Sequence, residues 1–339
     1  GADLRQYRPG YDVAGRKGFD RRCVTFDAGE PFMERYAPAI KDLAARDVVS
    51  RAILTEIRAG RGIGGKAYVH LDLTHLGERK ITEKLWEITS FARIYLGIDA
   101  VSQPIPVAPT CHYLMGGIPT DTDGRVLADE KGRVVPGLFA AGECACVSVH
   151  GANRLGCNSL LDLLVFGRRA GRVMKEDVQG IEVPASRPDP VEAVKERLAA
   201  LMGHDGVERS HLIRQDMQAI MTDHGSVFRT EESLKQGIDA ILALKERFSR
   251  VAVTNKGKSF NYDLMETIEL GHQLDLCEVI LVSARNRRES RGAHFREDFP
   301  ERDDRNYLRH TLIFDAPGGP RIEYKPVAIT RFQPQVRAY

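Results

Sequence analysis

Apolar residues at helical spacing predict seven helices in this chain. One begins near Ser159, and the others span residues 42–56, 82–96, 190–202, 210–223, 231–248 and 262–284. Thr82 is placed to cap the start of its helix, and Gly225 is placed to end the helix that precedes it. The helix at 231–248 is expected to bury one apolar stripe, made of Leu234, Ile238, Ile241 and Leu242.

Strand signals lie between and after these helices. Residues 68–73 alternate between apolar and polar, and short apolar runs at 125–128 and 138–141 predict two more strands. Three prolines between residues 104 and 109 favour an extended segment. Near the C-terminus, runs at 308–314 and 322–330 flank a turn at 316–320, which predicts a hairpin.

Composition narrows the function classes. The 339 residues carry a net charge of +2, so a nucleic-acid partner is not expected. No apolar run reaches the roughly 18 residues that a membrane-spanning helix needs. The six cysteines fit no zinc or iron–sulfur spacing, so we expect free thiols and no metal site.

Four segments carry candidate chemistry. An apolar strand at 137–141 ends in Gly142-Glu143, and a carboxylate at a strand end can bind hydroxyl groups of a ligand. The Gly-rich loop at 142–158 contains Arg154, which could pair a carboxylate, and leads into a helix start that favours negative charge. His112 lies in an apolar strand, and Arg46 begins an amphipathic run with Asp47 beside it.

Each of these segments also has a structural interpretation. Glu143 could be a surface acid, Arg154 a surface arginine, His112 a core residue, and Arg46 a partner in a helix salt bridge. The loop Gly60–Gly65 is Gly-rich, but no Gly-Lys-Ser/Thr follows and no helix is expected to begin there, so it predicts no phosphate site.

Taken in order, the motifs resemble those of one known family. They are the segments 33–38 (MERYAP), 46–49 (RDVV), 109–113 (PTCHY), 137–143 (GLFAAGE), 150–156 (HGANRLG), 290–294 (SRGAH), 324–327 (YKPV) and 329–332 (ITRF). Together they resemble the succinate dehydrogenase/fumarate reductase flavoprotein subunit, over about residues 23–339. The closing segments resemble the dehydrogenase subunit more than the related L-aspartate oxidase.

The resemblance implies a role for each matching residue. Arg46 would transfer a proton to or from the dicarboxylate, and His112 with Arg154 would bind its carboxylates. Glu143 would bind the ribityl chain of FAD, and Asn158, Ser159 and Leu160 would lie against its isoalloxazine ring. Because a guanidinium keeps its proton up to strongly alkaline pH, the chemistry favours the direction in which Arg46 donates.

The implied reaction is oxidation of succinate to fumarate, with a hydride passed to the flavin and a proton to Arg46. The implied partners are an iron–sulfur subunit and membrane anchors, which would place the protein peripherally on the cytoplasmic face of a bacterial inner membrane. Three alternatives stay open: a fumarate reductase, an L-aspartate oxidase relative, or a non-catalytic fragment without flavin.

The resemblance also implies an α+β, multi-domain fold. We expect part of a capping domain at 23–100, the C-terminal part of an FAD-binding α/β domain at 101–180, a helical domain at 185–285 and a small hairpin domain at 286–339. The strand–Gly-x-Gly-x-x-Gly–helix fingerprint for the ADP part of FAD is not expected in this chain. Residues 1–22 match no family segment, for which a frameshift or a mis-set start is our hypothesis.

Overall fold

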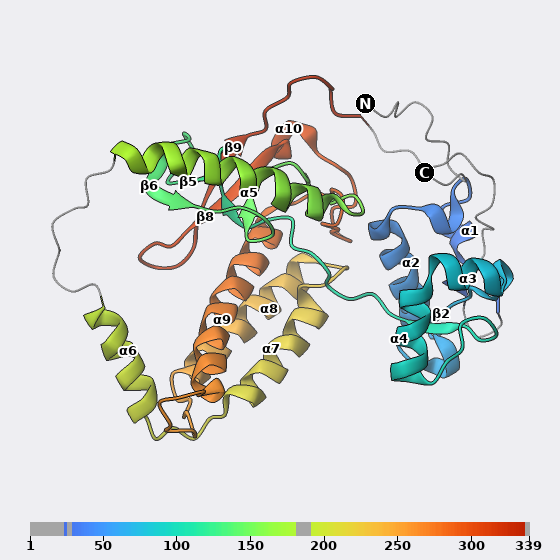
Figure 1. Cartoon of the computed structure of the whole chain (residues 1–339), viewed down its shortest axis with the longest axis horizontal. Coiled ribbons are helices and arrows are strands. Elements are labelled where there is room, and N and C mark those ends of the chain that lie inside the picture. The colour runs from blue at the N-terminus through green and yellow to red at the C-terminus, as the bar shows by residue number, and fades with distance from the viewer. Residues whose placement is uncertain (1–23, 26–28, 181–190, 336–339) are drawn as a thin grey trace. The chain divides into compact units, whose positions relative to one another are not determined.

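The structure, a computed structural model, describes residues 24–25, 29–180 and 191–335 (Figure 1). The expected non-matching segment 1–22 lies outside these residues, and so does the segment 184–190, whose three prolines predict a linker. The chain divides into two compact units, Gly1–His112 with Arg331–Tyr339 (unit 1) and Tyr113–Thr330 (unit 2). The fold is α+β and multi-domain, and the finer domain boundaries expected from the sequence stay predictions.

Unit 1 surrounds a small antiparallel sheet with helices. The sheet has the order β1 (Val24–Thr25), β2 (Val69–Leu71), β3 (Ile105–Val107), so the proline-rich segment is extended as expected. The helices are α1 (Met33–Tyr36), α2 (Arg46–Arg58), α3 (Glu78–Lys84) and α4 (Trp86–Leu96). The first two pack with β2 in one buried cluster around Phe32, Met33 and Val69.

Two helix predictions in unit 1 need correction. The helix expected from residue 42 begins only at Arg46, because Ala44 and Ala45 are extended, with ψ of 156° and 150°. The helix expected at 82–96 is two helices that meet at Leu85, whose backbone leaves the helical region at φ −128°, ψ 23°. Thr82 is therefore not an N-cap: it lies inside α3, which starts after Gly77 in a positive-φ conformation.

Unit 2 begins with two small sheets and a long helix. Strand β4 (Ile118–Pro119) pairs in parallel with β7 (Ala145–Cys146), and β5 (Arg125–Leu127) pairs antiparallel with β6 (Val134–Phe139). The predicted strand at 138–141 therefore begins earlier and ends at Phe139. Helix α5 (Asn158–Asp177) follows the Gly-rich loop, as the sequence predicts, and ends in a 3-10 turn at Val178–Gly180.

Three helices make the largest core of unit 2. They are α7 (Ser210–His224), α8 (Glu231–Phe248) and α9 (Tyr262–Asn286), and α6 (Glu192–Gly203) adds no buried residue (Figure 1). Gly225 ends α7 as predicted. Leu234 and Ile241 are fully buried and Ile238 packs against them, but Leu242 is 42% exposed and the next turn buries Leu244 instead.

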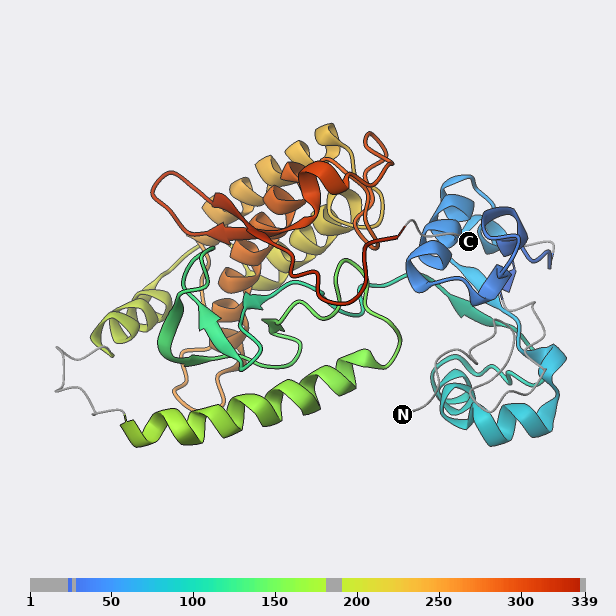
Figure 2. The ribbon, with the colours of Figure 1, turned by 90° about the horizontal axis from the view of Figure 1, so that it is seen from above.

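The C-terminal hairpin consists of β8 (Arg309–Phe314) and β9 (Arg321–Pro326), shown in red in Figure 2. It contacts α9 through β8. The second strand ends four residues before the predicted limit of Thr330. Pro326 already pairs with Arg309, and the chain before β8 turns away into α10 (Asp304–Tyr307), so residues 327–330 have no hairpin partner.

Candidate functional site

In unit 1, Arg46 is the first residue of α2 and is exposed. Asp47, which we considered as a partner for it, is buried and pairs with Arg51 one turn later at 3.1 Å. His112, the other unit 1 candidate, was expected in an apolar strand, but it is exposed in an irregular segment after β3 and is not a core residue. Both side chains are accessible, as groups that meet a substrate must be.

Helix α2 is anchored by a buried carboxylate that our sequence analysis missed. Glu56 is fully buried and binds Tyr36 of α1, Arg35 and Arg61. Burial opposes ionisation, but the hydrogen bonds from Arg61 and Tyr36 outweigh it and hold the pKa of Glu56 below its ordinary value. The cluster ties α1, α2 and the 60–65 loop together and so fixes the helix that begins with Arg46.

The Gly60–Gly65 loop carries no phosphate-binding geometry. It follows helix α2 and leads through the 3-10 turn Ile63–Gly65 into β2. A nucleotide fingerprint has the opposite order, with a strand before the loop and a helix after it. Gly62 is required by packing, because a Cβ there would lie 1.9 Å from the carbonyl oxygen of Lys66.

In unit 2, Arg154 has an unusual environment. The residue is only 8% exposed, its guanidinium lies 4.7 Å from the centre of the Tyr113 ring, and Nη1 donates to the carbonyl of Leu155 at 3.2 Å. Among the residues that the structure describes, none accepts a hydrogen bond from its buried Nε. A buried charged donor with an unused N–H is costly, unless a ligand supplies the acceptor.

Beneath Arg154 lies a polar triad that our sequence analysis did not identify. The His150 Nε2 atom is 3.0 Å from Asp162 Oδ2, and the Tyr113 hydroxyl lies 3.3 Å from that nitrogen and 3.4 Å from that oxygen. Burial, followed by the charge of Asp162, raises the pKa of Tyr113, so its hydroxyl stays protonated at neutral pH. The triad fixes the ring on which Arg154 rests.

The remaining candidates cluster around the start of α5. Glu143 is exposed just after β6, and its Oε1 accepts weakly from the Leu114 amide at 3.4 Å. Its neighbour Gly142 packs on α5: a Cβ there would meet Leu163 at 3.4 Å. Glu143 therefore lies close to the first turns of α5, which contain Asn158, Ser159 and Leu160.

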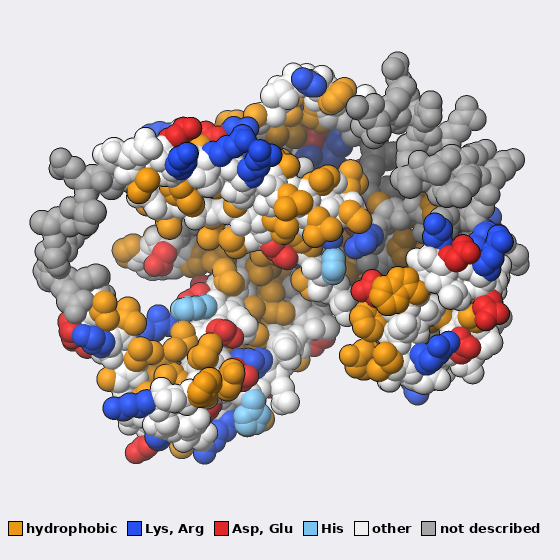
Figure 3. All heavy atoms as spheres, viewed as in Figure 1, with side chains coloured by type: hydrophobic (Ala, Val, Ile, Leu, Met, Phe, Trp, Pro, Cys, Tyr) orange, Lys and Arg blue, Asp and Glu red, His pale blue; other side chains and the backbone are white. Residues whose placement is uncertain are grey.

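The surface of α5 changes character along its length. In Figure 3, hydrophobic side chains gather over its N-terminal half and basic side chains over its C-terminal half. The exposed apolar residues of the N-terminal half include Leu160, Leu161, Leu164 and Val165, each at least 50% exposed. This apolar surface adjoins the loop that carries Arg154 and Glu143.

Most of the chain is similar to known protein families. A family model described as FAD binding domain matches residues 15–160, and one described as fumarate reductase flavoprotein C-term matches residues 214–339. The succinate dehydrogenase flavoprotein subunit of Coxiella burnetii is 46% identical over 304 residues, which are 88% of this chain and 51% of that protein. The chain belongs to the succinate dehydrogenase/fumarate reductase flavoprotein family.

Succinate dehydrogenase and fumarate reductase subunits are similar to this chain to the same degree. The fumarate reductase flavoprotein subunit of Escherichia coli is 45% identical over 305 residues, 88% of this chain and 50% of that protein. Among solved structures, a quinol fumarate reductase of E. coli superimposes with a TM-score of 0.83 at 40% identity, covering 92% of this chain and 55% of that one. The chain thus spans about half the length of the relatives it matches.

The cofactor of the matching domain is FAD, and the residues at the start of α5 fit a flavin. The Glu143 carboxylate suits ribityl hydroxyls, and a helix N-terminus favours the negative charge of a reduced flavin ring. The exposed apolar side chains of Leu160 and Leu161 suit a flat aromatic ring. The individual roles of Arg46, His112, Arg154, Glu143, Asn158, Ser159 and Leu160 stay predictions.

Proposed function

We propose that this chain is part of the flavoprotein subunit of a succinate dehydrogenase, which oxidises succinate to fumarate. The observation that carries the proposal is Arg154, a buried guanidinium on the loop before α5 whose Nε has no hydrogen-bond partner in the described part of the chain. A carboxylate is the natural acceptor for a planar guanidinium, because two parallel N–H donors match its two oxygens. Family membership makes a C4 dicarboxylate the ligand of choice.

In this mechanism, the residues of the chain bind the substrate and move one proton. Arg154 binds one carboxylate, and Tyr113 behind it keeps the guanidinium plane fixed. His112 binds the other carboxylate. Arg46 donates a proton to one carbon of fumarate, and in succinate oxidation Arg46 in its deprotonated form takes that proton back from the methylene carbon. Glu143 and the start of α5 would hold FAD, which would supply the two-electron chemistry of the reaction when bound.

The proposal includes partners and a location. The electrons would pass to an iron–sulfur subunit and on to quinone through membrane-anchor subunits, with this subunit peripheral on the cytoplasmic face of a bacterial inner membrane. Within the described residues, every helix is too short or too polar to cross a bilayer.

Dicarboxylate binding is tested by calorimetric titration of the full chain with malonate, a non-reacting analogue. Replacing Arg154 with alanine is expected to weaken binding by about 10- to 100-fold, since a hydrogen-bonded charge contributes about 1.5–3 kcal/mol. Arg172→Ala, which removes an exposed arginine from α5, is the matched control and should bind as the unmodified chain does. Equal affinity in all three proteins would remove Arg154 from the site.

Fumarate reductase is the second candidate, because relatives of that name are 45–46% identical to the chain. Succinate–dye reductase activity of purified yellow protein supports the dehydrogenase. Faster fumarate reduction with a reduced viologen supports the reductase. A colourless protein that has neither activity after incubation with FAD supports the non-catalytic alternative.

A further inference from the structure

A turn near the C-terminus contacts the loop that carries Arg154. The Ala293 amide donates to the Ala152 carbonyl at 2.9 Å, which joins two segments far apart in the sequence. Gly292 has φ +59°, and a Cβ added there would lie 2.5 Å from the Ala152 oxygen and 3.0 Å from the Ala152 Cβ. Only a residue without a side chain permits this approach.

The 291–294 turn is itself closed and rigid. Arg291 and His294 exchange backbone hydrogen bonds of 2.8 and 3.1 Å across it. The His294 ring is held on both sides, with Nδ1 2.9 Å from Arg229 Nη1 and Nε2 3.0 Å from the Arg287 carbonyl. The turn therefore cannot shift without disturbing Arg229 and Arg287.

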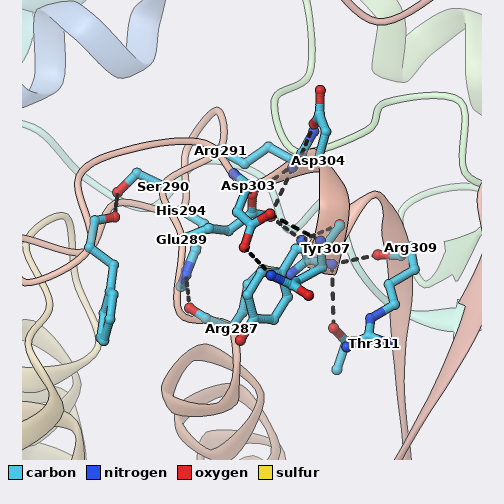
Figure 4. A network of polar contacts seen from close by, with 12 residues as sticks. Arg287, Glu289, Ser290, Arg291, His294, Asp303, Asp304, Tyr307, Arg309 and Thr311 are labelled. Atoms are coloured by element: carbon cyan, nitrogen blue, oxygen red, sulfur yellow. Dashed lines mark hydrogen bonds and ion pairs between the residues drawn. The ribbon is translucent and has the colours of Figure 1, made fainter.

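A buried ionic cluster fixes the other end of the turn (Figure 4). Glu289 is fully buried and receives two hydrogen bonds from Arg291, at 2.8 and 2.9 Å. Arg291 also donates to Asp304 at 2.6 Å, and the Asp303 amide donates to Glu289 at 2.9 Å. Breaking such a buried pair leaves an uncompensated charge, so the cluster resists rearrangement.

We propose that the 291–294 turn is a positioning element for Arg154, with Gly292 and Ala293 as its positioning residues. Ala152 lies two residues before Arg154, so the turn fixes the loop backbone on one side while Tyr113 supports the guanidinium on the other. Together they hold the buried Nε in one orientation. The inference rests on the proposed role of Arg154 in carboxylate binding.

The test is nuclear magnetic resonance of the full, isotope-labelled chain, with the side-chain Nε–H signal of Arg154 assigned through Arg154→Lys. Gly292→Ala is expected to shift or broaden this signal and to weaken malonate binding at least tenfold. Gly206→Ala is the matched control, because its Cβ would also meet a backbone carbonyl, that of Arg250 at 1.9 Å, away from this loop. It should leave the Arg154 signal unchanged.

A second variant keeps the test decisive should Gly292→Ala fail to fold. Ala293→Pro removes the N–H that binds Ala152, fixes the φ angle of residue 293, and is expected to move the Arg154 signal in the same direction. An unchanged Arg154 signal in a folded variant overturns the positioning role. If the signal moves but even the unmodified chain binds no malonate, the positioning role stands and the proposed carboxylate site fails.

Discussion

Arg154 and Arg296 are both buried arginines, but they differ in how many of their N–H groups form hydrogen bonds. Arg296 is fully buried and donates to both Asp298 oxygens at 2.8 Å and to the carbonyls of Ala284 and Arg285. Arg154 has a donor left over. The first arrangement stabilises a domain, whereas the second costs stability and is expected where a ligand completes it.

His294 gives a pH-dependent prediction. Burial and the neighbouring charge of Arg229 lower its pKa from 6.5 to about 4, and the hydrogen bond to the Arg287 carbonyl opposes this shift only in part. The unfolded chain takes up a proton below pH 6.5, whereas folded His294 stays neutral to about pH 4. Its contribution to the free energy of unfolding is therefore complete above pH 6.5 and falls by about 1.4 kcal/mol per pH unit below it.

The measurement is urea unfolding at several pH values between 4 and 7, for the unmodified chain and for His294→Gln. Glutamine can donate to Arg287 and accept from Arg229 without titrating, so the variant should lose a large part of the slope. Identical slopes in the two proteins would show that His294 is protonated in the folded state as readily as in the unfolded one.

At the scale of single residues, the motifs of the sequence single out Arg154 and Glu143, whose roles stay predictions. The triad of Tyr113, His150 and Asp162 could not be predicted, because its contacts join residues 37 and 49 positions apart. Periodicity describes one element at a time, and nothing in it reports which polar groups two elements bring together.

At the scale of the elements, the predicted helix bounds were most accurate where several helices share one hydrophobic core. Helices α7, α8 and α9 lie within a few residues of their expected bounds, because each buries a stripe in one shared cluster. The prediction of one continuous helix at 82–96 was wrong, because the apolar pattern continues across the break at Leu85. A continuous apolar pattern cannot distinguish one helix from two that pack on the same cluster.

The buried apolar stripe of α8 can be tested by comparing a buried residue with its exposed neighbour. Ile241 is fully buried, whereas Leu242 beside it is 42% exposed. Ile241→Ala is expected to lower the free energy of unfolding by about 2–5 kcal/mol, through lost burial and the cavity left behind. Leu242→Ala, the adjacent control, should cost clearly less. Thermal unfolding of both variants checks this, and similar losses would place Leu242 in the core.

At the scale of the whole molecule, the N-terminal half of α5 is an exposed apolar surface. Four neighbouring residues of α5, Leu160, Leu161, Leu164 and Val165, are each half or more exposed. Exposed apolar patches of this kind favour association. We expect the chain to self-associate at micromolar concentration, and the Leu161→Glu/Leu164→Glu double variant to raise the monomer fraction in sedimentation velocity.

The control for this prediction is Val207→Glu, which changes an 84% exposed residue before α7. It adds a charge without touching α5, so it should leave the monomer fraction as it is. If both variants raise that fraction alike, net charge rather than the α5 surface governs association.

The cysteines differ in exposure, and this difference makes the opening of the helical core measurable. Cys111, Cys144 and Cys157 are exposed free thiols, whereas Cys277 lies in the α7–α9 core, where burial raises its pKa to about 11. A thiol reagent should therefore modify the exposed group within minutes and reach Cys277 only when the bundle opens. The rate of the slow phase therefore measures how often the bundle opens, and no substitution in the chain is needed to observe it.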